Sequence, residues 1–165
     1  MCIRDRYYKV VTIIEKKLAK AYNIDNAKRM QDRRKETAMK NIMFIKADYG
    51  NLSNHFKAKE FQCKDKSEYL LVCKELVTIL ETIRNHFNAP VIINSGYRTP
   101  SWNSKVNGTS NSYHCKGMAA DIVVKGRSSR EVAEYADKIM EQGSVIRYTN
   151  FVHVDVREER YRKGV

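Results

Sequence analysis

The stretch SYHCKGMAADIVV, residues 112–124, decides the fold. Its second half, MAADIVV (118–124), is a short apolar run, which is typical of a buried strand. Asp121 stands inside this run, and a buried carboxylate is costly unless it is paired or bound to a metal. His114 precedes Asp121 by seven residues, with Gly117 and two alanines between them. We therefore expect a strand whose one carboxylate shares a site with His114.

A second fragment, FVHVDVR (151–157), has valine at every other position, as a strand with two different faces does. The face opposite the valines carries Phe151, His153, Asp155 and Arg157. This strand therefore adds a second histidine to the candidate site.

The two fragments together predict a zinc site. Zinc is bound by imidazole and carboxylate groups, and a catalytic zinc has three protein ligands and one position open to water. Small residues before Asp121 let the backbone approach without blocking the metal. We expect one Zn²⁺ per chain, held by His114, Asp121 and His153 in a cleft on the sheet. The other histidines, His55 and His86, lie on charged, helical stretches and are expected to face solvent.

The remaining segments predict an α+β fold, in which a small antiparallel sheet has flanking helices. Residues 68–87 repeat apolar side chains every three or four positions, which predicts an amphipathic helix, and VIINS (91–95) predicts a strand. Residues 96–113 are rich in Ser, Asn, Thr and Gly and predict a long, functional loop. SSRE (128–131) predicts a capping box at the start of a helix that Gly143 ends.

The charge distribution predicts two parts of the chain. Residues 1–48 hold 13 Lys and Arg against 6 Asp and Glu, and residues 7–22 place apolar side chains on one helical face. We expect a basic, helical N-terminal appendage over 1–48 and the main domain over 49–165, because Gly50-Asn51 is a turn signal. Early in that domain, Phe56 and Phe61 are expected to anchor a short turn to the core.

Composition narrows the classes of function. The net charge of +12 attracts polyanions, which include nucleic acid, anionic lipid and the acidic polymers of a bacterial wall. No run approaches the roughly 18 apolar residues of a membrane span, and the N-terminus lacks the features of a signal peptide, so we expect synthesis in the cytoplasm. Four cysteines without a CxxC pair predict free thiols, with pairing of Cys63 and Cys73 left open.

Three quoted fragments closely resemble the M15 zinc peptidases: SGYRTPSWNSKVNG (95–108), SNSYHCKGMAADIVV (110–124) and FVHVDVR (151–157). The family pattern is Ser-x-His-x-x-Gly-x-Ala-x-Asp followed by a distal His in a late strand. This family includes D-Ala-D-Ala carboxypeptidases and endolysin peptidases that cut peptidoglycan peptides. The resemblance covers about residues 50–157 and does not reach the basic N-terminal part.

The resemblance implies a hydrolase with zinc on His114, Asp121 and His153. It assigns Arg98, in the GYR element, to a substrate carboxylate, for which a planar and permanently charged guanidinium is suited. The alternative for Arg98 is an ordinary surface arginine that stabilises the loop.

Three neighbouring residues have two interpretations each. Ser112 either hydrogen-bonds substrate or caps the turn before His114. Tyr97 and Trp102 either form walls of the cleft or pack against the core. We expect Ser112 and Tyr97, with Arg98, to bind substrate.

One departure from the family concerns the general base. Many members carry an acid three residues before the distal His, where this chain has Asn150, and an amide cannot accept the proton of water. Asp155 shares a strand face with His153 and is the expected substitute. It is otherwise a partner that orients a ligand imidazole, or a structural ion pair with Arg157.

Three functions remain to be compared. The first is a zinc peptidase acting on peptidoglycan stem peptides or crosslinks, as a D-Ala carboxypeptidase or an endolysin-type endopeptidase released in phage-type lysis to reach the wall. The second is a catalytically lapsed, zinc-stabilised wall-binding module, which Asn150 keeps open. The third, a nucleic-acid binder, rests on charge alone and has no recognition motif, so we expect no specific nucleic-acid partner. We expect a monomer without a transmembrane segment.

Overall fold

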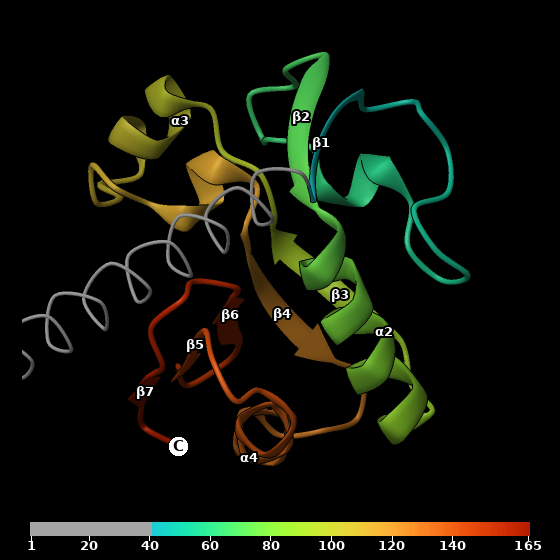
Figure 1. Cartoon of the computed structure of the whole chain (residues 1–165), viewed down its shortest axis with the longest axis vertical. Helices are drawn as coiled ribbons and strands as arrows, with labels where there is room; N and C mark the ends of the chain where they lie inside the picture. Colours follow the sequence, from blue (N-terminus) through green and yellow to red (C-terminus); the bar gives the residue numbers. More distant parts are fainter. Residues whose placement is uncertain (1–40) are drawn as a thin grey trace, which may run out of the picture. The chain divides into compact units, whose positions relative to one another are not determined.

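The computed structural model describes residues 41–165. Within this range the chain is α+β, with two small sheets and three α-helices (Figure 1). The predicted helix over 7–22 and Cys2 lie outside the described residues. The described part forms one compact unit that begins at Asn41.

The smaller sheet pairs β1 (Ile42–Lys46) with β2 (Tyr69–Cys73) in antiparallel register. Residues 42–46, which the charge pattern assigned to the appendage, therefore belong to the same compact unit as the rest of the described chain. The turn signal at Gly50 lies within this unit. Between the strands lies the 3₁₀-helix η1 (Ala58–Phe61). The expected anchor Phe56 precedes η1 and the other anchor, Phe61, ends it, and both rings are buried in the core.

The helix predicted over 68–87 is shorter than expected. It begins at Lys74 as α2 (Lys74–Phe87), because the preceding residues form β2. Leu70 and Val72 alternate into the core, and β1 supplies the partner strand for their backbone groups. Apolar runs of this length fit a strand or a helix, and the pairing strand decides between them. The buried face of α2 carries Leu76, Val77, Leu80 and Ile83.

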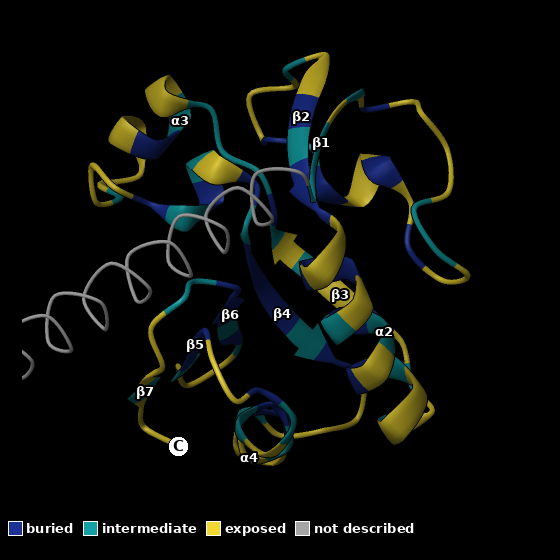
Figure 2. Ribbon diagram, viewed as in Figure 1, coloured by how far each residue is buried: buried dark blue, intermediate teal, exposed yellow. Residues whose placement is uncertain are grey.

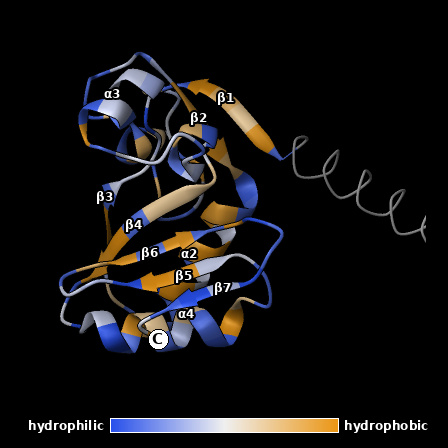
Figure 3. Cartoon of the chain, turned by 90° about the vertical axis from the view of Figure 1, so that its left-hand side faces the viewer, coloured by the Kyte–Doolittle hydropathy of each residue, from blue (hydrophilic) through white to orange (hydrophobic). Residues whose placement is uncertain are grey.

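The larger sheet has the strand order β3-β4-β6-β5-β7. Its strands are β3 (Val91–Ser95), β4 (Ala119–Val124), β6 (Val152–Asp155), β5 (Ser144–Arg147) and β7 (Tyr161–Lys163). Three of the pairings are antiparallel, as predicted, but β7 runs parallel to β5. Figure 3 shows β4, β6, β5 and β7 side by side, with the outer strand β7 in hydrophilic colours. The strands β5 and β7 were not predicted from the sequence.

Helix α4 (Ser129–Ile139) begins at the predicted capping box. The Ser128 hydroxyl accepts a hydrogen bond from the Glu131 N–H, and the Glu131 carboxylate accepts one from the Ser128 N–H. It ends at Ile139 rather than at Gly143. Gly143 (φ 79°) instead makes the turn into β5, where a Cβ would lie 2.3 Å from the Asp155 carbonyl oxygen. Together α2 and α4 cover one face of the sheet, and the core lies between them and the strands (Figure 2).

The predicted long loop over 96–113 contains a short helix, α3 (Pro100–Lys105). The Thr99 hydroxyl caps it by accepting the Trp102 N–H at 3.2 Å, and Pro100 occupies its first turn. The 3₁₀-helix η2 (Tyr113–Lys116) follows and leads directly into β4.

Candidate metal centre

Two candidate ligands are cross-strand neighbours. Asp121 of β4 lies opposite His153 of β6 in the antiparallel register. Because side chains alternate along a strand, Ile122 and Val154 point into the core while Asp121 and His153 share the other face. The site is therefore on the face of the sheet that α2 and α4 do not cover.

The third candidate, His114, reaches this face from η2. Gly117 ends η2 with φ 69°, in the left-handed region that favours glycine. The ring of His114 is buried, and its Nδ1 lies 2.7 Å from the carbonyl oxygen of Gly96. A carbonyl accepts only, so Nδ1 carries the proton and Nε2 presents a lone pair. This carbonyl partner leaves no signal in the sequence, because every residue type supplies a backbone carbonyl.

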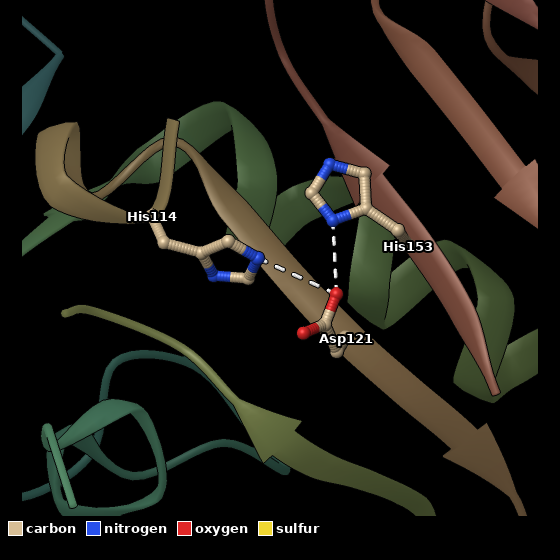
Figure 4. Close-up of side chains that lie close together, drawn as sticks. All are labelled: His114, Asp121 and His153. Carbon is tan, nitrogen blue, oxygen red and sulfur yellow. Dashed lines mark hydrogen bonds and ion pairs between the residues drawn. The ribbon is translucent and has the colours of Figure 1, made fainter. Parts of the chain in front are cut away.

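The three side chains converge on one carboxylate oxygen (Figure 4). Asp121 Oδ1 lies 3.4 Å from His114 Nε2 and 2.9 Å from His153 Nδ1. One ligand atom from each residue can be chosen so that all three lie within 4.8 Å of one another. The structure thus brings together the His–Asp–His set that the sequence predicted.

This donor set fits zinc. Tetrahedral zinc with ligand bonds of about 2.0–2.1 Å separates its ligand atoms by roughly 3.3 Å, close to the two spacings found here. Each imidazole is also held at its other nitrogen, His114 by Gly96 and His153 by Asp155, as histidines bound to metals usually are. The group can therefore hold a metal ion.

Asp155 lies behind His153 and is completely buried. Its Oδ2 is 3.0 Å from His153 Nε2, and Arg157 donates Nε to Oδ1 at 2.8 Å and Nη2 to Oδ2. Burial raises the pKa of Asp155, but the hydrogen bonds from Arg157 and His153 outweigh it and hold this pKa at about 2. Asp155 is thus an ionised carboxylate that contacts both partners the sequence analysis had considered.

The same balance applies to the carboxylate between the histidines. Burial raises the pKa of Asp121, but the contacts with the imidazoles of His114 and His153 outweigh it and hold this pKa well below the ordinary value. For His153, burial lowers the pKa, and the hydrogen bonds to Asp121 and Asp155 raise it above the ordinary value of 6.5. An ionised carboxylate thus lies between the two imidazoles, and this is a set of donor groups that a cation can bind.

Arg98 is part of this site rather than a free surface arginine. Its Nη2 lies 2.8 Å from Asp121 Oδ2, and its Nε donates to Ser95 Oγ at 2.8 Å. The guanidinium therefore holds the carboxylate oxygen that faces away from the histidines. It also lines a pocket of about 290 Å³ beside Asp121.

The other residues considered as substrate contacts lie in different surroundings. Trp102 lines this pocket, whereas Tyr97 packs against the core and is absent from the pocket lining. Ser112 is buried and precedes the first turn of η2 without a side-chain cap to it. His55 and His86 are exposed, as expected, and lie outside the His–Asp–His group. Cys63, Cys73 and Cys115 are free thiols, as predicted for the described cysteines.

The sequence comparison decides the family. The family described as Peptidase M15 matches residues 54–155, which is more than half of the chain. The chain belongs to the peptidase M15 family. The match spans all three members of the His–Asp–His group and supports a metallopeptidase. No curated protein matches the chain. Between residues 41 and 165 of this M15 peptidase, no helix has the length and apolar character needed to cross a membrane.

Proposed function

We propose that this M15 peptidase hydrolyses peptide bonds of peptidoglycan stem peptides or crosslinks, as a D-Ala carboxypeptidase or as an endolysin-type endopeptidase. The observation that carries the proposal is the convergence of His114 Nε2, Asp121 Oδ1 and His153 Nδ1 on one face of the sheet. We assign these three atoms as ligands of one zinc ion per chain. When bound there, zinc supplies a water of lowered pKa and polarises the scissile carbonyl.

The residues around the ligands keep them in the binding geometry. The Gly96 carbonyl fixes the tautomer of His114, and the Asp155 carboxylate accepts from His153 Nε2 so that Nδ1 faces Asp121. Arg98 holds Asp121 Oδ2, which leaves Oδ1 toward the two histidines. Each ligand thus has one partner that limits its rotation.

The position of Asp155 supports a positioning role over that of the general base. A base must reach the water whose proton it accepts. Asp155 is 0 % exposed, and both of its oxygens are engaged by Arg157 and His153. We therefore assign Asp155 to orienting His153.

A catalytically lapsed, zinc-stabilised wall-binding module is the second candidate. Asn150 stands where many relatives carry the acid, and Asp155 is enclosed. In this case the chain would hold zinc and bind walls without cleaving them. The basic charge suits an acidic wall polymer under both candidates. For location we propose synthesis in the cytoplasm and action on the wall after release, as a monomer.

The test is product analysis. The purified full-length chain, loaded with zinc, is incubated with peptidoglycan of different wall types and with short D-Ala-terminated peptides, and the products are read by mass spectrometry. Released D-Ala identifies a carboxypeptidase, and cleaved stems or crosslinks identify an endopeptidase. Zinc-loaded protein that leaves every wall type intact rejects the peptidase and favours the lapsed module.

A further inference from the structure

The pocket beside Asp121 has a defined chemical character. Its lining comprises Lys64, Asn94, Ser95, Arg98, Trp102, Val106, Asp121 and Phe151. Asp121 belongs both to this pocket and to the proposed metal centre, so the pocket adjoins that centre. The lining combines two cations with three apolar side chains.

The two cations differ in what they already contact. Arg98 donates to Ser95 Oγ and to Asp121 Oδ2, so much of its hydrogen-bonding capacity serves the metal ligand. Lys64 is exposed, and none of the ion pairs found between residues 41 and 165 includes it. Lys64 is therefore the cation of the pocket that makes no ion pair within the described part of the chain.

The carboxylate adjacent to Lys64 in sequence does not neutralise it. Asp65 accepts the Thr99 hydroxyl through Oδ2 and the Ser67 N–H through Oδ1 at 3.0 Å. The hydrogen bond from Thr99 holds the pKa of Asp65 below its ordinary value, so this carboxylate is ionised. None of the ion pairs found between residues 41 and 165 joins Asp65 or the pocket residue Asp121 to Lys64, so the ammonium group is free to contact a substrate carboxylate.

The backbone of Lys64 is held in place from both sides. The Thr99 N–H donates to Cys63 Sγ at 3.4 Å, and the Thr99 hydroxyl donates to Asp65. Thr99 follows Arg98 directly in the sequence. Its two hydrogen bonds therefore connect residues 63–65 to the segment that carries Arg98. The position of Lys64 at the pocket is therefore set by the fold.

We infer that Lys64 is a specificity-determining residue that binds a carboxylate of the peptide substrate in the pocket beside Asp121. The apolar surface of the pocket comes from Trp102, Val106 and Phe151. The alkyl part of the substrate residue that carries the carboxylate packs against this surface. An ammonium suits this role because it is a compact point charge on a flexible stem. The inference rests on the proposed peptidase function and deepens it.

Two sources present this carboxylate, the C-terminus of the peptide and an acidic side chain within it. Two pairs of peptides separate them. In the first pair the C-terminus is a free acid or a carboxamide, and in the second an internal acidic residue is replaced by its amide. A preference in the first pair indicates recognition of a chain end, and a preference in the second indicates recognition within the chain.

The experiment compares the full-length protein with Lys64→Gln, with Lys64→Glu and with the control Lys59→Gln. Lys59 is exposed on η1 and does not line the pocket. Binding of each peptide is measured by calorimetry with a metal chelator present, which prevents cleavage, and kcat and KM are measured separately for the zinc-loaded proteins.

We expect the original protein and Lys59→Gln to prefer the acid of one pair over its amide. Lys64→Gln should weaken binding of that acid about tenfold, leave the amide unchanged and raise KM more than it lowers kcat. Lys64→Glu should favour the amide. Equal binding of acid and amide in both pairs by the original protein, or a preference that survives in Lys64→Gln, overturns the inference. A preference lost in Lys64→Gln together with no cleavage rejects the peptidase but retains the carboxylate site.

Discussion

His153 lies between two carboxylates, with Nδ1 2.9 Å from Asp121 and Nε2 3.0 Å from Asp155. The two acids have different surroundings. Asp121 faces the second histidine and the pocket, whereas Asp155 is enclosed with Arg157. At the scale of single residues, the structure therefore separates a carboxylate that contacts both histidines from one that is enclosed behind His153.

The ligand assignment predicts the metal content of single variants. His114→Ala and Asp121→Ala should each lose stoichiometric zinc and activity together, because two remaining donors hold zinc weakly. Metal content is measured by atomic emission on the purified proteins. His86→Ala serves as the control, since His86 is exposed and stacks on Tyr135, away from the site. Full zinc content in both ligand variants would refute the assignment.

Replacing Asp155 with Asn distinguishes orientation from general-base catalysis. If Asp155 orients His153, zinc affinity should fall by roughly 10–100-fold, the usual effect of losing such a partner. Chelator competition measures the affinity, and the pH profile of turnover is measured in parallel. Unchanged zinc affinity with turnover abolished would instead identify Asp155 as the base.

Zinc affinity should depend on pH because ligand imidazoles must be neutral. The pKa of His153 is lowered by burial but raised more by Asp121 and Asp155, so its net position is above 6.5. A raised pKa means that the proton is retained to higher pH, and the loss of affinity on acidification should begin above that value. Titrations between about pH 8 and 5 measure this. An affinity that stays constant from about pH 7 to 5 is incompatible with two imidazole ligands.

At the scale of elements, the approach of η2 to β2 depends on a glycine. A Cβ at Gly117 would lie 2.4 Å from the backbone carbonyl of Leu71, and the Gly117 carbonyl accepts the Cys73 N–H at 2.8 Å. This contact fixes the 3₁₀-helix that carries His114. The spacing between His114 and Asp121 is thus maintained by packing against the smaller sheet.

Two glycine variants separate crowding from backbone strain. Gly117 and Gly126 both have positive φ, 69° and 75°, but a Cβ at Gly126 would meet nothing within 4 Å. Gly126→Ala should reduce the free energy of unfolding by about 1–2 kcal/mol from the left-handed conformation alone. Gly117→Ala should lose roughly 1–3 kcal/mol more, because the added methyl meets backbone. Urea denaturation measures both, and equal losses would show that the contact with β2 does not matter.

The elements that the sequence predicted well are those with a local signal. The strand around Asp121 and the capping box at Ser128 are encoded by neighbouring residues, and the structure has both. The start of α2 was missed because the preceding residues form β2, whose partner strand β1 is distant in the sequence. The strand β5 was missed although its partner β6 follows closely, because its four residues are too few to show a period. Short apolar runs carry no periodicity that separates helix from strand.

The candidate site likewise contains residues that the sequence predicted and residues that it did not. The His–Asp–His set follows a recognisable spacing, and the structure brings it together. The Gly96 carbonyl and Lys64 were missed, because a backbone acceptor has no residue type and an exposed lysine has no pattern. The side chain of Tyr97 packs against the core, which is one of the two interpretations of this aromatic residue, and its contact with substrate stays a prediction.

At the scale of the whole molecule, the charge of +12 should govern encounter with an acidic wall. The Debye length falls from about 10 Å at 0.1 M salt to about 3 Å at 1 M, so the long-range attraction between the chain and the wall should weaken as salt rises. We expect retention on purified walls that bear anionic polymer to fall steeply as salt rises, while zinc content stays constant. Co-sedimentation at increasing salt measures this. Retention that does not respond to salt would assign wall binding to specific contacts alone.

The most direct test of the account is the position of the metal. A crystal of the zinc-loaded protein, measured on both sides of the zinc absorption edge, locates zinc by its anomalous signal. We expect one peak per chain, bonded to His114 Nε2, Asp121 Oδ1 and His153 Nδ1. A peak at other residues, or none in protein that retains zinc in solution, would contradict it.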